Sequence, residues 1–396
     1  MTIRICGDVE MEKIRIGDVC DILNGYAFKS ENYARSGIRI IRISNVQKGY
    51  IEDTTPAFYP IETADLDRFM LEQGDLLVSL TGNVGRVAIL GKELLPAALN
   101  QRVACLRLKS DKISKNYLFH ILNSNFFEQQ CIMASNGVAQ KNLSTEWLKN
   151  YEVPCYERDQ QEKIVMVLST IQSVISGRKH ELQKLDDLVK ARFVEMFGIY
   201  PANPKGWETG TIRDVVSDVR YGSSRPAVDG GKYPYLRMNN ITYGGELDLS
   251  DTKRIDIPDN ELDKCTVRRG DVLFNRTNSK ELVGKTCVYN RDDMMVLAGF
   301  VIRVRVSERI LPEFLSEFLN TEFSKQMLLA MCKTAIGQAN INAQEMQNIG
   351  LYLPPIELQR KFVQFKEQTD KSKVAVQKAL DEAQLLFDSL MQKYFG

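Results

Sequence analysis

The sequence has little of what metalloenzymes, secreted proteins and membrane proteins require. It holds two histidines, His120 and His180, and neither has a partner at metal-ligand spacing. Its eight cysteines include no Cys-x-x-Cys pair, which fits a reducing compartment better than a disulfide framework. No apolar run approaches the ~20 residues of a membrane span, and residues 1–12 show no signal peptide. We therefore expect a cytoplasmic protein without a metal site.

An excess of charge of one sign is also missing. Lys and Arg number 52 and Asp and Glu number 51, so no strongly basic DNA-binding domain is expected, and any DNA binding must depend on local charge or on partner subunits. No Asn-Pro-Pro-Tyr-like methylation motif and no glycine-rich fingerprint after a strand occur. Residues 279–286 end like a phosphate-binding loop, but Ser279 replaces the first glycine and a strand-like segment follows. This segment is interpreted as a hairpin loop.

What the sequence does contain is an internal duplication. The segment Met196-Phe197-Gly198 recurs as Tyr394-Phe395-Gly396, an offset of 396 − 198 = 198 residues. A repeat of this length is far above the ~20 to 50 residues of solenoid repeats, and each half can form its own core. The chain is therefore predicted to form two similar domains. Further segments match at nearly the same offset: 163–165 with 361–363, 113–118 with 310–315, 74–77 with 270–273, and 41–46 with 236–241.

Both halves show the same order of parts. Short runs rich in Ile, Val, Leu and Tyr predict a β-rich region, and a helical stretch follows. A polar loop and a proline segment then lead into a long helix. The fold class is therefore predicted to be α+β. The predicted helical stretches are 115–131, with Ser114 as N-cap, and 314–331, after Pro312. The predicted domains are 1–157 and 199–356, and the long helices are 158–198 and 357–396.

Apolar residues in both long helices recur on alternating three- and four-residue steps, interrupted at Arg178 and Arg192. We predict a two-helix antiparallel coiled-coil spacer with a β-rich head at each end, related by a pseudo-two-fold axis. A parallel pair would need a return connection that the sequence lacks. The two arginines are expected to extend their charged ends to solvent. The predicted seam comprises Ile164, Leu168, Ile171, Ile175, Leu182, Leu185, Val189 and Met196, and Phe362, Thr369, Val376, Leu380, Ala383, Phe387, Leu390 and Tyr394.

These parts, taken in order, resemble the specificity subunit of type I restriction-modification systems. The resemblance depends on the helix starts Asp-Gln-Gln-Glu-Lys-Ile-Val at 159–165 and Glu-Leu-Gln-Arg-Lys-Phe-Val at 357–363, on the polar loops and proline segments before them, and on the closing Met-Phe-Gly and Tyr-Phe-Gly. It covers the whole chain. The first copy departs from the pattern where Pro154-Cys155 replaces the usual pair of prolines.

The resemblance implies a non-catalytic subunit of a phage-defence system. Each domain would be a target recognition domain for one half of a bipartite, asymmetric site in double-stranded DNA. Two methylation subunits would dock on the spacer, and endonuclease/translocase subunits would join them. S-adenosylmethionine, ATP and Mg²⁺ would bind to those partners, with no cofactor on this chain.

The polar loop at residues 275–280 is the strongest candidate for reading bases, because Arg pairs bidentately with guanine and Asn with adenine. A solvated turn is the alternative for this loop. Two domains that read different half-sites must differ where they touch bases and can agree where they touch phosphates or support the fold. Positions that differ between the repeats are therefore favoured for specificity. They are Ser79/Asn275, Leu80/Arg276, Gly82/Asn278 and Asn83/Ser279.

Positions that agree are assigned to backbone contact or to structure. Arg42 with Asn45 and Arg237 with Asn240 are of this kind. The loops at 24–26 and 221–225 form a second candidate, and the polar loops at 135–142 and 335–342 a third, for which helix capping is the alternative. The predicted DNA-binding residues are Asn24, Tyr26, Arg42, Ser44, Asn45, Ser79, Thr81, Asn83, Gln140, Lys141, Tyr221, Ser223, Arg225, Arg237, Asn239, Asn240, Asn275, Arg276, Thr277, Asn278, Lys280, Gln338 and Asn340.

One other function agrees with part of the sequence, and a third is disfavoured. A structural adaptor, with heads that bind proteins across a coiled-coil strut, agrees with the near-neutral charge. A stand-alone nuclease or methyltransferase is disfavoured because its catalytic motifs are missing. The sequence does not reveal the target bases or the length of the gap between the half-sites.

Overall fold

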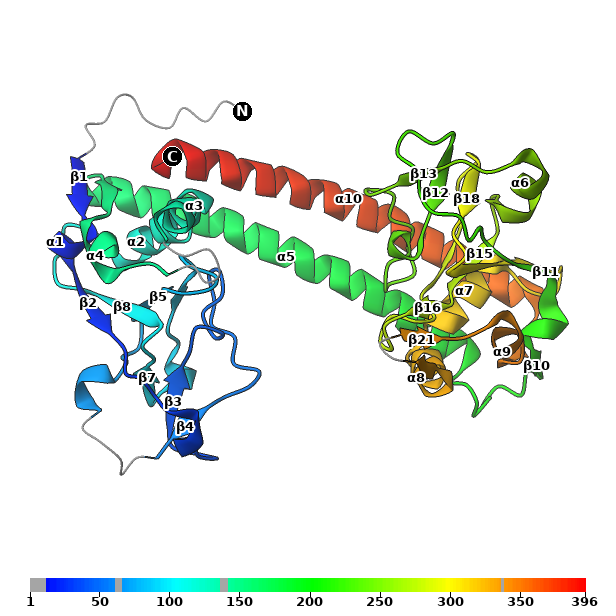
Figure 1. Cartoon of the computed structure of the whole chain (residues 1–396), viewed down its shortest axis with the longest axis horizontal. Coiled ribbons are helices and arrows are strands. Elements are labelled where there is room, and N and C mark those ends of the chain that lie inside the picture. Colours follow the sequence, from blue (N-terminus) through cyan, green and yellow to red (C-terminus); the bar gives the residue numbers. More distant parts are fainter. Residues whose placement is uncertain (1–11, 61–65, 136–141, 336–337) are drawn as a thin grey trace. The chain divides into compact units, whose positions relative to one another are not determined.

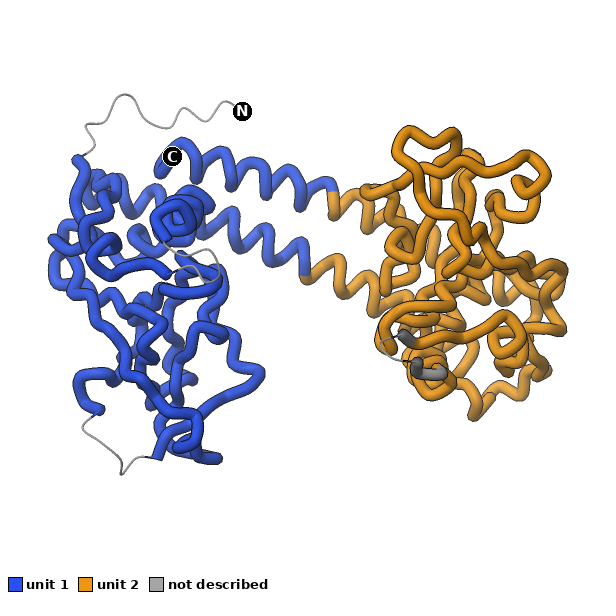
Figure 2. The backbone as a smooth tube through the Cα atoms, in the orientation of Figure 1, with its two compact units in different colours: residues 1–179, 378–396 blue, residues 180–377 orange. Residues whose placement is uncertain are grey.

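The computed structural model describes residues 12–60, 66–135, 142–335 and 338–396, and the chain divides into two compact units (Figure 2). Unit 1 comprises residues 1–179 and 378–396, and unit 2 comprises residues 180–377. Both boundaries fall inside the long helices α5 (Arg158–Phe197) and α10 (Ile356–Phe395), so each helix contributes one part to each unit. Each unit combines several small sheets with helices, as the predicted α+β class requires (Figure 1).

Unit 1 contains a four-stranded sheet in the order β2-β8-β5-β6, a three-stranded sheet in the order β4-β3-β7, and the pair β1-β9. Within the three-stranded sheet, β3 and β7 are parallel. The strands are β1 (Glu12–Arg15), β2 (Cys20–Asn24), β3 (Ile38–Ile41), β4 (Phe58–Tyr59), β5 (Leu76–Ser79), β6 (Val87–Ile89), β7 (Ala97–Leu99), β8 (Val103–Leu108) and β9 (Glu152–Cys155). The shorter helices are α1 (Ile16–Val19), α2 (Lys115–Leu122), α3 (Asn125–Ala134) and α4 (Thr145–Asn150).

Unit 2 repeats this plan with the sheet β11-β19-β15-β17, the sheet β13-β12-β18-β14 and the pair β10-β22, and it contains the small sheet β16-β21-β20. The strands are β10 (Glu208–Thr211), β11 (Val216–Tyr221), β12 (Tyr233–Leu236), β13 (Lys253–Ile255), β14 (Thr266–Val267), β15 (Val272–Asn275), β16 (Thr277–Asn278), β17 (Thr286–Val288), β18 (Met295–Leu297), β19 (Val301–Val306), β20 (Lys333–Ala335), β21 (Gln338–Asn340) and β22 (Gly350–Leu353). The shorter helices are α6 (Asp259–Cys265), α7 (Pro312–Asn320), α8 (Glu322–Met331) and α9 (Ala343–Gln347).

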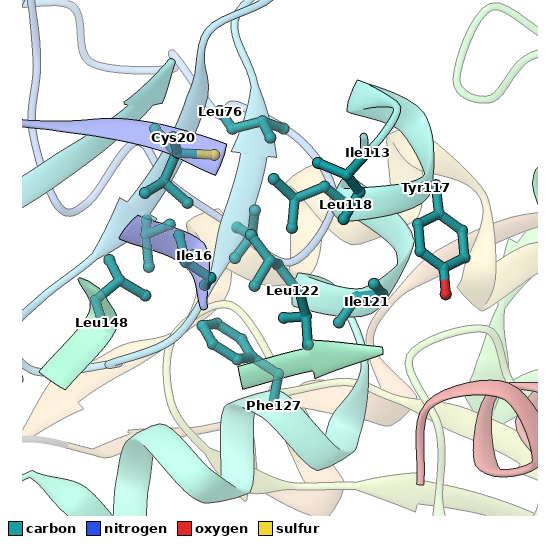
Figure 3. Packing of buried hydrophobic residues seen from close by; sticks show 14 of the residues in the cluster. Ile16, Cys20, Leu76, Ile113, Tyr117, Leu118, Ile121, Leu122, Phe127 and Leu148 are labelled. Carbon is teal, nitrogen blue, oxygen red and sulfur yellow. The ribbon is translucent and has the colours of Figure 1, made fainter. Parts of the chain in front are cut away.

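Both faces of the four-stranded sheet of unit 1 are buried. Successive side chains of a strand point to opposite sides, so each strand contributes to two cores. Leu76 and Val78 of β5 join the core formed with the helices, where Tyr117 and Phe127 pack (Figure 3). Leu77, between them in sequence, joins a second core with the three-stranded sheet. In unit 2 the residues of β15 divide between two cores in the same way. This sandwiched sheet fixes the loops at its ends.

The helical stretches are each broken in two, so the prediction of one continuous helix per repeat was wrong. Ser124 ends the run after α2, and its side chain accepts a hydrogen bond from Phe127 N to cap α3. Thr321 does the same for α8 by accepting from Ser324 N. A hydroxyl at the N-cap satisfies a backbone donor that has no partner inside the helix, which favours a new helix at that residue.

The two long helices run antiparallel within unit 2. Phe362 packs edge-on against Phe193 and Phe197, with ring centroids 5.2 and 5.7 Å apart, and Lys373 pairs with Asp186. In unit 1 the last turn of α10 enters the core, where Phe395 packs on Tyr117 at 5.6 Å. The C-terminal turn therefore lies in the unit that holds the N-terminal domain, as predicted.

The predicted seam residues are all buried or half-buried. One detail of the seam differs near the end of α5, where Phe193 and Phe197 are fully buried and the predicted Met196 is only half-buried. The register shifts because these turns pack into the core of unit 2 as well as on α10. Arg192 lies over the Phe365 ring at 5.6 Å and reaches Glu195 at 2.8 Å, which confirms that its charged end extends past the seam.

Candidate nucleic-acid interface

One end of the four-stranded sheet has the same backbone pattern in both units. In unit 2, Arg276 N donates to Phe300 O at 3.0 Å, and Arg276 O accepts from Ile341 N at 2.9 Å. In unit 1, Leu80 N donates to Arg102 O at 3.0 Å, and Leu80 O accepts from Leu143 N at 2.8 Å. Leu80 and Arg276 therefore occupy equivalent positions, as the sequence alignment of the repeats proposed.

Three of the predicted residues of unit 2 come together around the guanidinium of Arg276. It lies over the Tyr221 ring at 4.9 Å, and its Nη2 donates to Asn340 Oδ1 at 3.2 Å. Its Nη1 makes a long hydrogen bond of 3.5 Å to Gly299 O. Tyr221 is held in turn, because its hydroxyl accepts from Ala343 N at 2.9 Å. We refer to Tyr221, Arg276 and Asn340 as the arginine cluster.

The equivalent place in unit 1 has different chemistry. Leu80 is 6% exposed and belongs to the hydrophobic core. Thr81 forms an isolated bridge with Asn142, in the same relation as Thr277 to Asn340 in unit 2. Asn24, at the position of Tyr221, is exposed at the end of β2. The two units thus share a backbone and differ in side chains at this edge.

The loops that follow β2 and β11 approach the neighbouring strand closely. A Cβ on Gly25 would lie 2.2 Å from Asn100 backbone atoms, and one on Gly222 would lie 2.2 Å from Leu297 O. Tyr26, after the first of these glycines, packs against Phe28 at 5.0 Å. Glycine is therefore required at both positions by space and not by a positive φ.

Ser223 and Arg225 of the predicted second loop are engaged within unit 2. Ser223 is buried, and its Oγ accepts from Arg225 N at 3.2 Å. The Arg225 guanidinium donates to both carboxylate oxygens of Glu261, at 2.7 and 3.2 Å, and this hydrogen bonding lowers the pKa of Glu261. Arg225 nevertheless stays exposed at the surface.

The shared Arg and Asn pairs build a tight turn in each unit. Asn45 Oδ1 accepts from Arg42 N at 2.9 Å, and Asn240 Oδ1 accepts from Arg237 N at 2.8 Å. Both asparagines are buried, and each amide donates to a carbonyl across the turn. These contacts agree with the structural alternative for Asn45 and Asn240, and their contact with the DNA backbone stays a prediction. The adjacent Ser44 and Asn239 are exposed.

Ser79 and Asn275 are also fully buried. Ser79 Oγ donates to Asn83 O and accepts from Arg86 N at 3.0 Å, and Asn275 Nδ2 donates to Leu282 O at 3.2 Å. The contacts that the structure shows for both residues support the loop that follows, and their assignment to base contact stays a prediction. They were predicted because sequence comparison detects that two positions differ and does not detect whether they are exposed.

The remaining predicted residues lie around these loops. Thr277 is buried beside Asn340, Asn278 is half-buried, and Asn83 and Lys280 are exposed. Of the third candidate loop, Asn342 caps α9, since its Oδ1 accepts from Glu345 N at 2.9 Å. Gln140, Lys141 and the side chain of Gln338 lie outside the described residues.

Sequence reasoning missed the turns that adjoin this edge, residues 100–103 in unit 1 and 298–301 in unit 2. Their central residues are exposed in both units, apart from the half-buried Gly299. A signal was present, because the offset of 198 residues aligns Gln101-Arg102 with Gly299-Phe300, two pairs that differ completely. Residue type alone did not indicate this turn, because its counterpart in unit 2, Gly299-Phe300, is not polar.

The phosphate-loop-like segment is a hairpin, as interpreted from the sequence. It leads into β17 instead of a helix, and the buried Lys285 donates to Met238 O at 2.9 Å. Burial lowers the pKa of Lys285. Within the described residues, no group of His, Cys, Asp and Glu has an arrangement suited to a metal ion, and no helix is long and apolar enough to cross a membrane.

Comparison with known proteins agrees with this architecture. The family model described as "Type I restriction modification DNA specificity domain" matches residues 8–186 and 204–383. The specificity subunit of the type I restriction enzyme EcoKI from Escherichia coli strain K12 is 22% identical, over 96% of this chain and 87% of the relative. The StySPI specificity subunit from Salmonella potsdam is 23% identical, over 96% and 87%.

Two solved structures share the fold. A type I restriction-modification S subunit from M. genitalium has a TM-score of 0.57 at 15% identity, over 100% of this chain and 98% of that one. A chain from a study of complex assembly and conformational transition of the type I R-M system has a TM-score of 0.60 at 19% identity, over 97% of each chain.

Proposed function

This chain belongs to the type I restriction modification DNA specificity family, and we propose that it is the subunit that reads DNA sequence in a restriction-modification complex. Each unit reads one half of a bipartite, asymmetric site. The family match covers a domain in each half of the chain, which supports one reading domain per half-site over an adaptor with two protein-binding heads.

The shared edge of the four-stranded sheet is the observation that supports a different half-site for each unit. Equivalent backbone hydrogen bonds hold Leu80 in unit 1 and Arg276 in unit 2, yet one side chain is apolar and buried and the other is a half-buried cation. A common backbone with unlike side chains is what two readers of unlike half-sites require, because base edges are distinguished by the donors, acceptors and apolar groups that meet them.

Arg276 is prepared for such a contact. Stacking on Tyr221 and the hydrogen bond to Asn340 restrict the guanidinium and leave N–H groups for a base. A side chain that is ordered before binding loses less conformational entropy on binding. Guanine, with its two acceptors in the major groove, is the base that a guanidinium recognises best.

The chain itself is proposed to be non-catalytic. Two methylation subunits with S-adenosylmethionine supply the methyl transfer, and endonuclease/translocase subunits supply cleavage with ATP and Mg²⁺. The near-zero net charge supports this division, since phosphate contacts from partner subunits would then provide much of the affinity.

The test is selection of bound duplexes from a random-sequence DNA library by the full-length chain, alone and together with co-expressed methylation subunits. The complex should select two conserved base clusters separated by a fixed gap. The chain alone should bind weakly and transfer no methyl group. Selection of a single continuous motif, of no motif, or methyl transfer by the purified chain would contradict the proposal.

A further inference from the structure

In the turn that enters β8 in unit 1 and β19 in unit 2, each residue makes at least one backbone hydrogen bond. Val103 N donates to Asn100 O, and Val301 N donates to Ala298 O, both at 2.9 Å, so each segment is a tight turn of four residues. Its first central residue is fixed from the side: Gln101 N donates to Tyr26 O at 3.0 Å, and Gly299 N donates to Ser223 O at 2.7 Å.

The second central residue is held by the backbone of Leu80 in unit 1 and of Arg276 in unit 2. Arg102 O accepts from Leu80 N, and Phe300 O accepts from Arg276 N, each at 3.0 Å. Gly25 and Gly222 permit the close approach of the loop that fixes the first central residue. The two units therefore present the same rigid turn, and only the side chains at its tip differ.

Those side chains are exposed and unlike. Gln101 and Arg102 are both exposed in unit 1, and among the described residues neither side chain has a hydrogen bond or an ion pair. In unit 2 the tip is Gly299 and Phe300, and Phe300 is 51% exposed. An unpaired glutamine and arginine on a rigid turn, and a half-exposed phenylalanine on its counterpart, have no evident role in stabilising either unit.

We propose that these two turns, residues 101–102 in unit 1 and 299–300 in unit 2, are specificity determinants that contact base edges of the two half-sites. The proposal depends on the function proposed above and goes beyond it by naming residues that sequence reasoning did not select. Gln101 and Arg102 suit an adenine and a guanine, because their side chains can form paired hydrogen bonds with those bases. Phe300 suits the apolar methyl group of a thymine.

Arg276 links the turn of unit 2 to the arginine cluster. Its Nη1 donates to Gly299 O at 3.5 Å, and its own backbone N bonds the next residue of the turn. In unit 1 the arginine stands on the turn itself, at Arg102, and the neighbouring position is the buried Leu80. Each unit thus has one arginine and one apolar residue at this pair of positions, in opposite order.

The test uses the full-length chain with its methylation subunits and the library selection described above, applied to Arg102→Ala, Arg102→Lys and Phe300→Ala. Lys109→Ala and Met294→Ala are matched controls. Lys109 follows the opposite end of β8 and is 42% exposed at its side chain, and Met294 precedes β18 and is 45% exposed. Lys109 also pairs with Asp21 at 3.3 Å, so Lys109→Ala tests the loss of an exposed positive charge away from the turn. Met294→Ala tests the loss of an exposed apolar side chain away from the turn.

Arg102→Ala should reduce preference by about 5- to 150-fold at one or two adjacent base pairs of one half-site, and Phe300→Ala should reduce preference only in the other half. Arg102→Lys should keep most of the affinity and lose the preference, because an ammonium is a point charge without the paired donors of Arg. The controls should keep the wild-type motif.

An unchanged motif for Arg102→Ala and Phe300→Ala, with a bipartite motif for the wild type, would overturn this inference and leave the proposed function in place. Loss of affinity without any change of the motif would likewise overturn it, since the turns would then act on the DNA backbone. Failure of the wild-type complex to select a motif would instead overturn the proposed function, and this inference with it.

Discussion

Arg276 and Arg237 lie in the same unit and differ in what surrounds their guanidinium groups. Arg237 Nη2 donates to Asp251 Oδ2 at 2.9 Å and to Asp251 O at 3.2 Å, so its charge is already paired. Arg276 has an aromatic ring and a neutral amide as neighbours. Arg237 thus has a carboxylate partner, whereas among the described residues Arg276 has no ion pair and keeps hydrogen-bond donors beside the edge of the sheet.

We therefore predict different effects when each arginine is removed. Arg276→Ala should cost about 1 to 3 kcal/mol of discrimination at one base pair of one half-site, whereas Arg237→Ala should weaken binding to all sequences alike. Sequencing of methylated sites in cells that express each variant complex separates the two effects. An unchanged methylation motif for Arg276→Ala would remove the arginine cluster from the reading surface.

His120 gives unit 1 a dependence on pH. It is buried on α2, its Nε2 lies 3.3 Å from Ser169 Oγ, and burial lowers its pKa from 6.5 to about 4. The unfolded chain therefore takes up this proton at a higher pH than the folded chain does. The contribution of the neutral His120 side chain to the free energy of unfolding is therefore complete above pH 6.5 and is lost as the pH falls towards 4.

Replacing His120 by phenylalanine should flatten this part of the stability profile. Between pH 6.5 and 4 the wild type should lose up to about 3 kcal/mol more of its free energy of unfolding than His120→Phe does, at 1.36 kcal/mol per pKa unit. Denaturant unfolding of both proteins at pH 7.5, 6 and 5 measures the difference. Parallel profiles would show that His120 does not titrate on unfolding.

At the scale of elements, the start of each long helix is tied to its unit by a buried glutamine. Gln161 Oε1 accepts from Ser114 N at 2.8 Å, and its Nε2 donates to Lys112 O and Tyr156 O at 2.7 and 2.8 Å. Gln359 repeats the arrangement. In unit 1 the amide of Gln161 thus joins α5 to the loop before it and to the start of α2.

Gln359→Leu should lower the free energy of unfolding of unit 2 by about 2 to 4 kcal/mol, because it leaves buried backbone groups without partners. Gln364→Leu, on the exposed face of the same helix, is the matched control and should change stability by less than about 0.5 kcal/mol. Denaturant unfolding compares the two. Equal stability of both variants would mean that the anchor contributes nothing.

At the scale of the whole molecule, both units share the long helices. Since α5 and α10 each contribute to unit 1 and unit 2, the length of the helix pair is a candidate for what sets the gap between the half-sites. Because α5 and α10 pair antiparallel within unit 2, a change of length must be made in both helices to keep their apolar residues in contact.

Inserting one heptad after Leu182 and one after Leu380 keeps the apolar period and adds about 10 Å to the helix pair. The half-sites should keep their sequences, and the gap between them should grow by two to three base pairs, with lower activity because the distal site also rotates around the duplex. Methylation at the original spacing would exclude this helix pair as the ruler. An insertion in one helix alone should mismatch the seam and destabilise the protein.

The sequence by itself determined the duplication, the α+β class, the long helices and the family, because these depend on patterns that repeat along the chain. The seam residues were predicted correctly since the period of a helix fixes which side chains share a face. Sequence also separated the hairpin at 279–286 from a phosphate-binding loop, as the residues after it favour a strand.

Only the tertiary structure decided which polar residues face outward. Ser79 and Asn275 differ between the repeats and were favoured as readers, but hydrogen bonds inside the loops bury them. The turns at 100–103 and 298–301 became candidates because strands distant in sequence fix their backbones. Burial and long-range pairing depend on where the chain returns in space, and the local sequence of a loop does not encode that return.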